Sequence, residues 1–162
     1  MNAAVLTVSD GVFHGQREDA SGAVLQEDAE AAGYRVVARA VVPDDTEQIG
    51  GQIVEWCESP LLDVALVLVT GGTGFAPRDV TPEALAAVLE RRAPGLDEAM
   101  RAASMRVKPH GMLTRGISGT RGRTLILSFP GSPRACRENL AVVQPVLEHA
   151  LRLLREDATR HL

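Results

Sequence analysis

A glycine-rich stretch offers the clearest chemistry in the chain, Val69-Thr70-Gly71-Gly72-Thr73-Gly74. Three glycines in four residues permit positive φ angles and a close approach of the backbone to a ligand. Consecutive N–H groups in such a loop form a concave anion site, to which the Thr73 hydroxyl adds a donor. The stretch has neither P-loop spacing nor a lysine, and it does not fit the dinucleotide fingerprint. It predicts a phosphate site of another type, the alternative being a tight strand-to-helix connection.

Two aspartates are candidates for a metal site. Asp79 precedes the helix start Thr81-Pro82 and could simply cap that helix. Beside a phosphate loop, however, a carboxylate is repelled by phosphates unless a cation intervenes, which predicts Asp79 as a Mg²⁺ ligand, direct or through water. Asp44 and Asp45 are adjacent acids after an expected strand. The spacing of Asp45 and Gln48 resembles a capping box, which leaves Asp44 for the site.

Two further loops carry candidate ligands. Ser132 is placed to cap a helix whose free N–H groups, with Gly131, would form a second anion site, a plain cap being the alternative. Ser9 and Asp10 follow the first expected strand and would bind a phosphate or metal, or form an Asx turn. The chain has no GxSxG elbow and no Cys/His signature. These features predict phosphoryl or nucleotidyl transfer by positioning and metal-assisted electrostatics, without a protein nucleophile.

The elements that must position these loops alternate between strand and helix. Strands are expected at 3–8, 34–42, 64–69 and 124–129, the last pairing with 112–118 as a hairpin. Helices are expected over 20–32, from the Asp45 cap to 58, over 81–92 and 96–104, and along the apolar stripe 136–154, kinked or divided at Pro145. This order predicts a three-layer α/β/α domain with a mostly parallel central sheet and a small β-hairpin. Ligands of such sheets bind beyond the carboxyl ends of the strands, which is where the loops that carry these candidate residues lie.

Composition narrows the function classes. With 162 residues, 45% hydrophobic and 23% charged, the chain is expected to form one globular domain over 1–162. A net charge of −4 and only 3% aromatic residues argue against a nucleic-acid partner. The longest apolar run, Val64–Val69, is far shorter than the roughly 20 residues of a membrane helix, and no basic leader is present, so a cytoplasmic location is expected. Cys57 and Cys136 lack zinc-site spacing and are expected to be reduced thiols.

The motifs together resemble the MogA/MoaB family of molybdenum cofactor biosynthesis. The resemblance covers nearly the whole chain and extends to Ser104, Pro109 and Leu113-Thr114-Arg115. It is carried by Val8-Ser9-Asp10, Val42-Pro43-Asp44-Asp45, Leu68 to Gly74, Pro77-Arg78-Asp79-Val80-Thr81-Pro82 and Phe129-Pro130-Gly131-Ser132-Pro133. It implies a homotrimer, with hexamers in some members, that transfers an adenylyl group from Mg-ATP to molybdopterin. The products would be adenylyl-molybdopterin and pyrophosphate, ahead of a downstream molybdenum-insertion protein.

The resemblance also implies roles for single residues. Asp44 and Asp79 match the family's essential aspartates, which would organise Mg²⁺ and the ATP phosphates. The loop of Gly71, Gly72, Thr73 and Gly74 would bind the nucleotide phosphates. The terminal phosphate of the pterin or its neighbouring groups would be held by Ser104, Thr114, Gly131 and Ser132. Two alternatives remain: a non-catalytic molybdopterin-binding or scaffold member of the family, and an unrelated enzyme of nucleotides or sugar phosphates. The presence of both aspartates favours an active enzyme.

Overall fold

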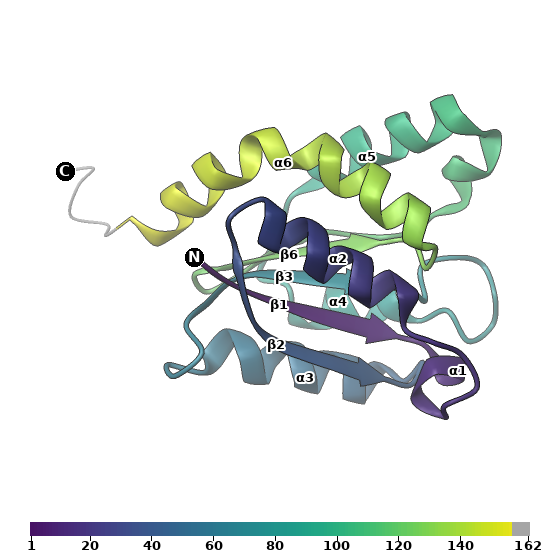
Figure 1. Ribbon diagram of the computed structural model, residues 1–162, viewed down its shortest axis with the longest axis horizontal. Helices are drawn as coiled ribbons and strands as arrows, with labels where there is room; N and C mark the ends of the chain where they lie inside the picture. Colours follow the sequence, from purple (N-terminus) through teal and green to yellow (C-terminus); the bar gives the residue numbers. More distant parts are fainter. Residues whose placement is uncertain (157–162) are drawn as a thin grey trace.

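The protein is built around one six-stranded sheet (Figure 1). The computed structural model describes residues 1–156. In spatial order the strands are β2 (Arg35–Val42), β1 (Asn2–Val8), β3 (Val64–Thr70), β6 (Thr124–Phe129), β5 (Gly119–Arg121) and β4 (Arg91–Arg92). The first four are parallel, and β5 and β4 extend the sheet with antiparallel pairings. The mostly parallel α/β fold expected from the sequence is confirmed.

Helices cover both faces of the sheet (Figure 1). One face carries α2 (Ala20–Ala31), α5 (Pro94–Val107) and α6 (Pro133–Arg155), and the other carries α3 (Thr46–Glu58) and α4 (Thr81–Val88). Two short segments complete the described chain, the helix α1 (Asp10–Phe13) and the 3₁₀ helix η1 (Pro109–Leu113). The three layers place every loop after a parallel strand at one edge of the sheet.

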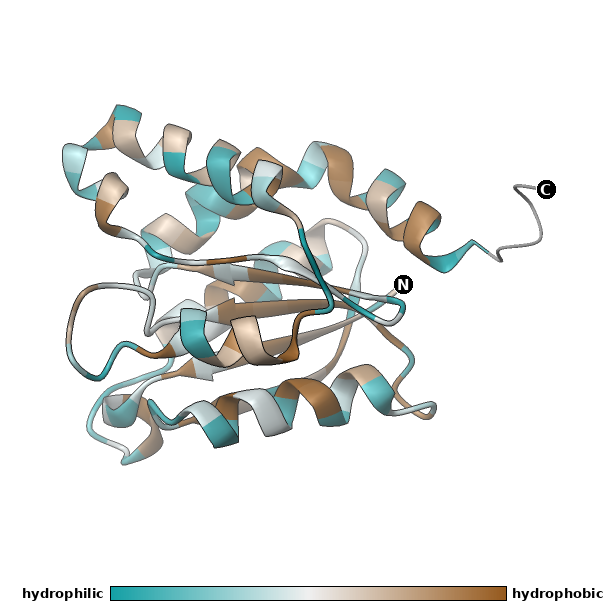
Figure 2. Cartoon of the chain, turned by 180° about the vertical axis from the view of Figure 1, so that it is seen from behind, coloured by the Kyte–Doolittle hydropathy of each residue, from teal (hydrophilic) through white to brown (hydrophobic). Residues whose placement is uncertain are grey.

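The side chains of the central strands explain why both faces need cover. In β1, Ala3 and Val5 belong to the core beneath α2 and α6, whereas Ala4 and Leu6 belong to the core beneath α3 and α4. All seven residues of β3 are buried, as expected for a central parallel strand. Figure 2 shows these hydrophobic strands enclosed between helices of mixed hydropathy. No helix within residues 1–156 is long and apolar enough to cross a membrane.

The expected hairpin of 112–118 with 124–129 is wrong in its first strand. Residues up to Leu113 belong to η1, and only the segment Gly119–Arg121 pairs with β6. The backbone of 114–116 finds other partners. Arg101 donates to the carbonyls of Thr114 and Gly116 at 3.3 Å each, and the Arg115 N–H donates to the Thr73 carbonyl at 2.7 Å. Because these groups are satisfied from outside the sheet, the segment does not form a ladder with β6.

Two other helix expectations need correction. The helix expected over 81–92 ends at Val88, because the N–H groups of Glu90 and Ala93 donate to the Thr120 and Ser118 carbonyls across the sheet edge. Of the two alternatives for the terminal helix, kinked or divided at Pro145, the divided one is wrong, since α6 runs without a break from Pro133 to Arg155 with Pro145 inside it. Pro145 lies on the exposed side of α6, where water can satisfy the carbonyl that proline leaves without a donor.

Candidate active site

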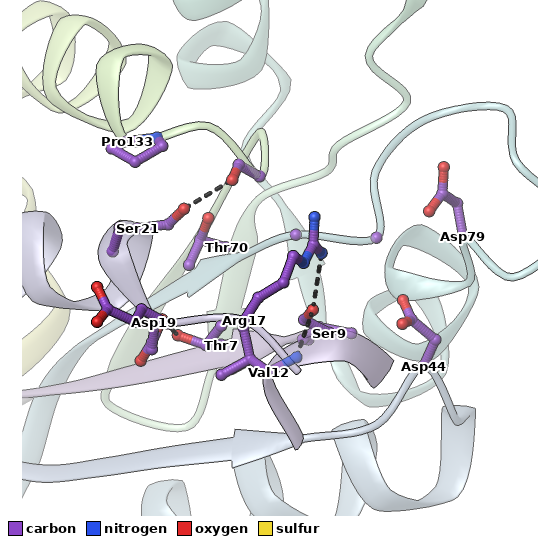
Figure 3. Close-up of a pocket in the computed structure, with 16 residues that line it drawn as sticks. Thr7, Ser9, Val12, Arg17, Asp19, Ser21, Asp44, Thr70, Asp79 and Pro133 are labelled. Atoms are coloured by element: carbon purple, nitrogen blue, oxygen red, sulfur yellow. Dashed lines mark hydrogen bonds between the residues drawn. The ribbon is translucent and has the colours of Figure 1, made fainter. Parts of the chain in front are cut away.

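Two adjoining cavities occupy the edge of the sheet where the parallel strands end. The first, of about 460 Å³, is lined by the ends of β1 and β3, the start of α2, and the side chains of Ser9, Arg17 and Asp44 (Figure 3). The second, of about 450 Å³, lies between the glycine loop, α5, η1 and the start of α6. Gly72, Asp79 and Gly131 line both cavities. The shared residues form the boundary across which two bound molecules would meet.

The structure divides the residues selected from sequence between these cavities. The first cavity is lined by Ser9, Asp44, Gly71, Gly72, Asp79 and Gly131. The second is lined by Gly72, Thr73, Gly74, Asp79, Ser104, Thr114, Gly131 and Ser132. Asp10 is absent from both linings, and its carboxylate accepts two hydrogen bonds from Arg78. Eleven of the twelve selected residues therefore line one cavity or both.

Two glycines of the loop are required by its geometry. Gly71 has a φ of 97°, and a Cβ there would lie 2.2 Å from the Val8 carbonyl oxygen. Gly72 has a φ of 65°, and its Cβ would lie 2.4 Å from the Thr81 Oγ1. Thr81 fixes the loop by donating its hydroxyl to the Gly71 carbonyl at 2.8 Å and its N–H to the Gly72 carbonyl at 3.0 Å. The loop is therefore pressed against the end of β1 and the start of α4, where no other residue type fits without strain.

Asp10 and Asp44 join the loops that follow β1 and β2. The Asp44 N–H donates to Asp10 Oδ1 at 3.0 Å, and the Asp10 N–H donates to Asp44 Oδ2 at 2.8 Å. Arg78 then donates both Nε and Nη2 to the Asp10 carboxylate, at 2.9 and 3.0 Å. The Arg78 bonds, followed by the Asp44 N–H, lower the pKa of Asp10. Asp10 thus serves as an ionised anchor for the backbone that carries Asp44.

The Asp44 carboxylate is in a less favourable environment. Burial raises its pKa most, and the charges of Asp10 and Asp79 raise it further, against the lowering effect of the Asp10 N–H and Arg78. Asp45 does not share this role, because it caps α3 by accepting from the Gln48 N–H at 2.9 Å. The separation of a capping Asp45 from a cavity-lining Asp44 agrees with the sequence prediction.

Asp79 does not cap the helix that follows it. The N-cap of α4 is Val80, with no side-chain cap bond. The Asp79 Oδ2 instead accepts from the Ala76 N–H at 3.0 Å, and the Asp79 N–H donates to the Ala76 carbonyl at 2.9 Å. Figure 3 shows Asp79 and Asp44 on the same side of the first cavity. Two carboxylates from different loops therefore face a common space.

These two carboxylates fit a magnesium ion shared with phosphates. Mg²⁺ takes oxygen ligands and in nucleotide sites is held by one or two carboxylates together with substrate phosphates. The charge of Asp79 disfavours ionisation of Asp44, which is a condition that a bound cation relieves. Within residues 1–156 no group of three or more His, Cys, Asp or Glu side chains is arranged around a metal position. The donor set therefore suits a metal brought in with a phosphate ligand rather than a closed protein site.

Small hydroxyl groups and a helix start shape the second cavity. Ser132 caps α6 by accepting from the Ala135 N–H at 3.1 Å. The Ser104 hydroxyl donates to Asn139 Oδ1 at 3.1 Å, and the Thr114 hydroxyl donates to Thr73 Oγ1 at 3.5 Å. The cavity wall also includes Lys108 and His110, whose segment had no predicted shape. Hydroxyls, a helix N-terminus and the Lys108 ammonium suit a polar anionic ligand.

Two arginines of the site were not among the candidate site residues, although Arg115 lies in a segment that carries the family resemblance. Arg17 lines the first cavity and donates to Ser9 Oγ at 3.2 Å, and it has no carboxylate partner among residues 1–156 (Figure 3). Arg115 donates to the backbone of the glycine loop and to the carbonyl of Asp79. Neither position carries a local motif that separates it from the rest of the 17 lysine and arginine residues of the chain. Only their tertiary contacts distinguish them.

The chain matches known proteins over nearly its whole length. The family model described as a probable molybdopterin binding domain matches residues 4–149. Gephyrin of Dictyostelium discoideum is 44% identical over an alignment of 160 positions that covers 93% of this chain. The chain spans 22% of that gephyrin and about half or less of two further relatives. The molybdopterin adenylyltransferase of Helicobacter pylori strain J99 is 34% identical over 95% of this chain and 88% of its own length.

A solved structure agrees with this match. The molybdopterin biosynthesis enzyme MoaB of Thermus thermophilus superposes with a TM-score of 0.87 at 45% identity, covering 94% of this chain and 95% of its own. The glycine loop, the two aspartates and the two cavities described above lie within the matched residues. The chain therefore belongs to the MogA/MoaB family of molybdenum cofactor biosynthesis proteins.

Proposed function

We propose that this protein transfers the adenylyl group of ATP to molybdopterin. The observation that carries the proposal is the pair of adjoining cavities with Gly72, Asp79 and Gly131 on their common boundary. A transferase for two anionic substrates needs two sites and a place where the reacting atoms meet. The relative from Helicobacter pylori, named molybdopterin adenylyltransferase, supports the same reaction.

In this proposal the first cavity takes the nucleotide. Gly71 and Gly72 approach the phosphates with their backbone, and Arg17 supplies a planar cation without a competing carboxylate among residues 1–156. Ser9 holds Arg17 and lines the same cavity. Asp10 contributes indirectly, because its carboxylate accepts a hydrogen bond from the Asp44 N–H and so fixes the backbone of Asp44. Asp44 and Asp79 would hold Mg²⁺, which when bound neutralises the phosphate charge that the two carboxylates would otherwise repel.

The second cavity takes molybdopterin. Ser104, Thr114, Gly131, Ser132 and the Thr73-Gly74 end of the glycine loop line it. In this proposal Thr73 and Gly74 therefore face the pterin, whereas the resemblance implied the nucleotide phosphates for the whole glycine loop. Together these groups hold the terminal phosphate of the pterin against the boundary that the two cavities share. A phosphate oxygen of molybdopterin attacks the α-phosphorus of ATP, a new phosphorus–oxygen bond forms, and the bond to the departing pyrophosphate breaks. The protein aligns two anions and takes no covalent part.

A homotrimer, or the larger hexamer, remains part of the proposal. Exposed apolar side chains at Met105 and Val107 of α5 and at Met112 and Leu113 of η1 provide surface for contact between copies. A downstream protein that inserts molybdenum would receive the adenylylated product. We place the protein in the cytoplasm, where ATP is available.

Pyrophosphate release by the purified protein tests the function. Release is expected only when ATP, molybdopterin and Mg²⁺ are all present. Molybdopterin binding without release, under conditions in which an active family member turns over, would favour the non-catalytic binding or scaffold role. Failure to bind molybdopterin, with binding of another phosphorylated ligand, would point to an unrelated substrate.

A further inference from the structure

The loop that carries Asp79 has little packing to hold it in place. Phe75, Ala76, Pro77 and Arg78 are all exposed, and Phe75 keeps 69% of its surface accessible. Hydrogen bonds must therefore fix this loop. Asp79 and Ala76 bond to each other, which shapes the end of the loop but does not tie it to the rest of the molecule.

Two arginines supply that tie. Arg78 of the loop itself donates to the Asp10 carboxylate, and Arg115, from a distant segment, bonds to the backbone at both ends of the loop. Arg115 donates Nε to the Gly74 carbonyl at 2.7 Å and Nη2 to the Asp79 carbonyl at 2.8 Å. Its Nη1 pairs with the Glu83 carboxylate in the first turn of α4. The backbone N–H of Arg115 also donates to the Thr73 carbonyl at 2.7 Å. Arg115 therefore spans both ends of the 73–79 loop and the helix that follows it.

The segment around Arg115 is itself anchored beside the second cavity. Arg101 of α5 donates to the carbonyls of Thr114 and Gly116, on either side of Arg115, at 3.3 Å each. Thr114 lines the second cavity, whereas Asp79 lies on the boundary of the two. A continuous set of bonds thus runs from α5 through the 114–116 segment to the aspartate.

We propose that Arg115 is a positioning residue that sets the place of Asp79 relative to a ligand held beside Thr114. The proposal rests on the adenylyl transfer inferred above. Three acceptors in different directions use the planar fork of a guanidinium, and a lysine ammonium on a flexible stem cannot reach all three in one geometry. Misplacement of Asp79 would weaken an interaction made in the transition state, which lowers kcat and kcat/KM together.

Arg115→Lys tests this with a change that keeps the charge. We expect kcat to fall about ten- to a hundredfold, the range found for groups that orient a ligand of a metal, with KM for both substrates within about threefold. Arg121→Lys is the matched control, because Arg121 likewise bonds to a backbone carbonyl and a carboxylate, those of Val88 and Glu58, but neither acceptor belongs to the loop that carries Asp79. Its kcat should match the wild type. Guanidinium ion should restore part of the activity of Arg115→Ala, and an equal concentration of ammonium should not.

Amide hydrogen exchange of the 73–80 segment, without substrates, gives a readout independent of turnover. Exchange should speed up in Arg115→Lys and stay unchanged in Arg121→Lys. Wild-type kcat and exchange in Arg115→Lys would overturn the proposal. So would a Glu83→Gln variant that loses as much kcat as Arg115→Lys, since the ion pair alone would then account for the effect. If the wild type forms no adenylylated product, the proposed reaction fails, while the exchange measurement still decides whether Arg115 holds the Asp79 loop.

Discussion

Asp10 and Asp44 each accept a hydrogen bond from the other's backbone N–H, at 3.0 and 2.8 Å. This reciprocal pair joins the loops that follow β1 and β2, and Asp44 lines the first cavity. Only Asp10 is paired with a cation, Arg78, and the two carboxyl groups respond in opposite directions: the pKa of Asp10 is lowered and that of Asp44 is raised. The paired aspartate is a structural anchor, and the unpaired aspartate is available to a ligand.

Asp10→Asn should lower the free energy of unfolding at neutral pH but not in strong acid. Because the pKa of Asp10 is lowered in the folded state, its stabilising contribution is complete above the ordinary value of 3.8 and is lost as pH falls through the lowered value. The difference in unfolding free energy between wild type and variant should therefore be constant near neutrality and shrink below pH 3.8. Urea unfolding at several pH values measures it. A difference that grows in acid would contradict the assignment.

Asp44→Asn should separate stability from activity. The raised pKa means that ionised Asp44 costs stability as pH rises through its folded-state value, so the neutral amide should unfold at the same temperature or higher in metal-free buffer at pH 7. Turnover should be abolished, because the amide is a poor magnesium ligand. Asp45→Asn is the control, since asparagine caps a helix as well as aspartate does. Wild-type turnover in Asp44→Asn would remove this residue from the proposed mechanism.

The glycine loop should be intolerant of a single methyl group. Gly71→Ala would place its Cβ 2.2 Å from a backbone oxygen at a φ of 97°, and a loss of about 1–3 kcal/mol of stability is expected. Gly51→Ala in α3 meets no atom within 4 Å and should be neutral or stabilising by up to about 1 kcal/mol. Thermal and urea unfolding of the two variants compares them. Equal stability of both would show that the loop adopts another backbone.

The two cavities should respond separately to substitution. Arg17→Met should raise the dissociation constant of ATP about tenfold or more and leave that of molybdopterin unchanged, because Arg17 lines only the first cavity. Ser104→Ala should raise the dissociation constant of molybdopterin and leave that of ATP unchanged, since Ser104 lines only the second cavity. Titration calorimetry with each ligand alone measures both constants. A loss of ATP affinity in Ser104→Ala equal to that in Arg17→Met would mean that the ligands do not divide between the cavities as proposed.

Local signals in the sequence predicted much of this architecture. The Asp45 and Ser132 caps, the buried β3 strand and the glycine loop depend on neighbouring residues and on the burial of a central strand, and each lies where expected. The location of Asp44 and Asp79 at one edge followed from the rule that parallel strands end together. These elements required no knowledge of long-range contacts.

The remaining features depend on partners far away in the chain. The prediction of a 112–118 strand is wrong because Arg101 and the Thr73 carbonyl take up the backbone groups that a ladder would use. Arg78 pairs with Asp10, 68 residues away, and no local pattern indicates this partner. Arg115 was visible only as part of a resemblance. An arginine reaches several acceptors from one position, so its partners cannot be inferred from sequence spacing alone.

The most direct test of the central claim is mass-spectrometric detection of adenylyl-molybdopterin after incubation of the purified protein with molybdopterin and ATP. The experiment includes reactions with and without Mg²⁺ and a parallel series with Asp79→Asn. We predict product from the wild type that requires Mg²⁺ and is absent from Asp79→Asn. Bound molybdopterin with no adenylylated product, where an active family member forms it, would contradict the account and identify the protein as a non-catalytic member.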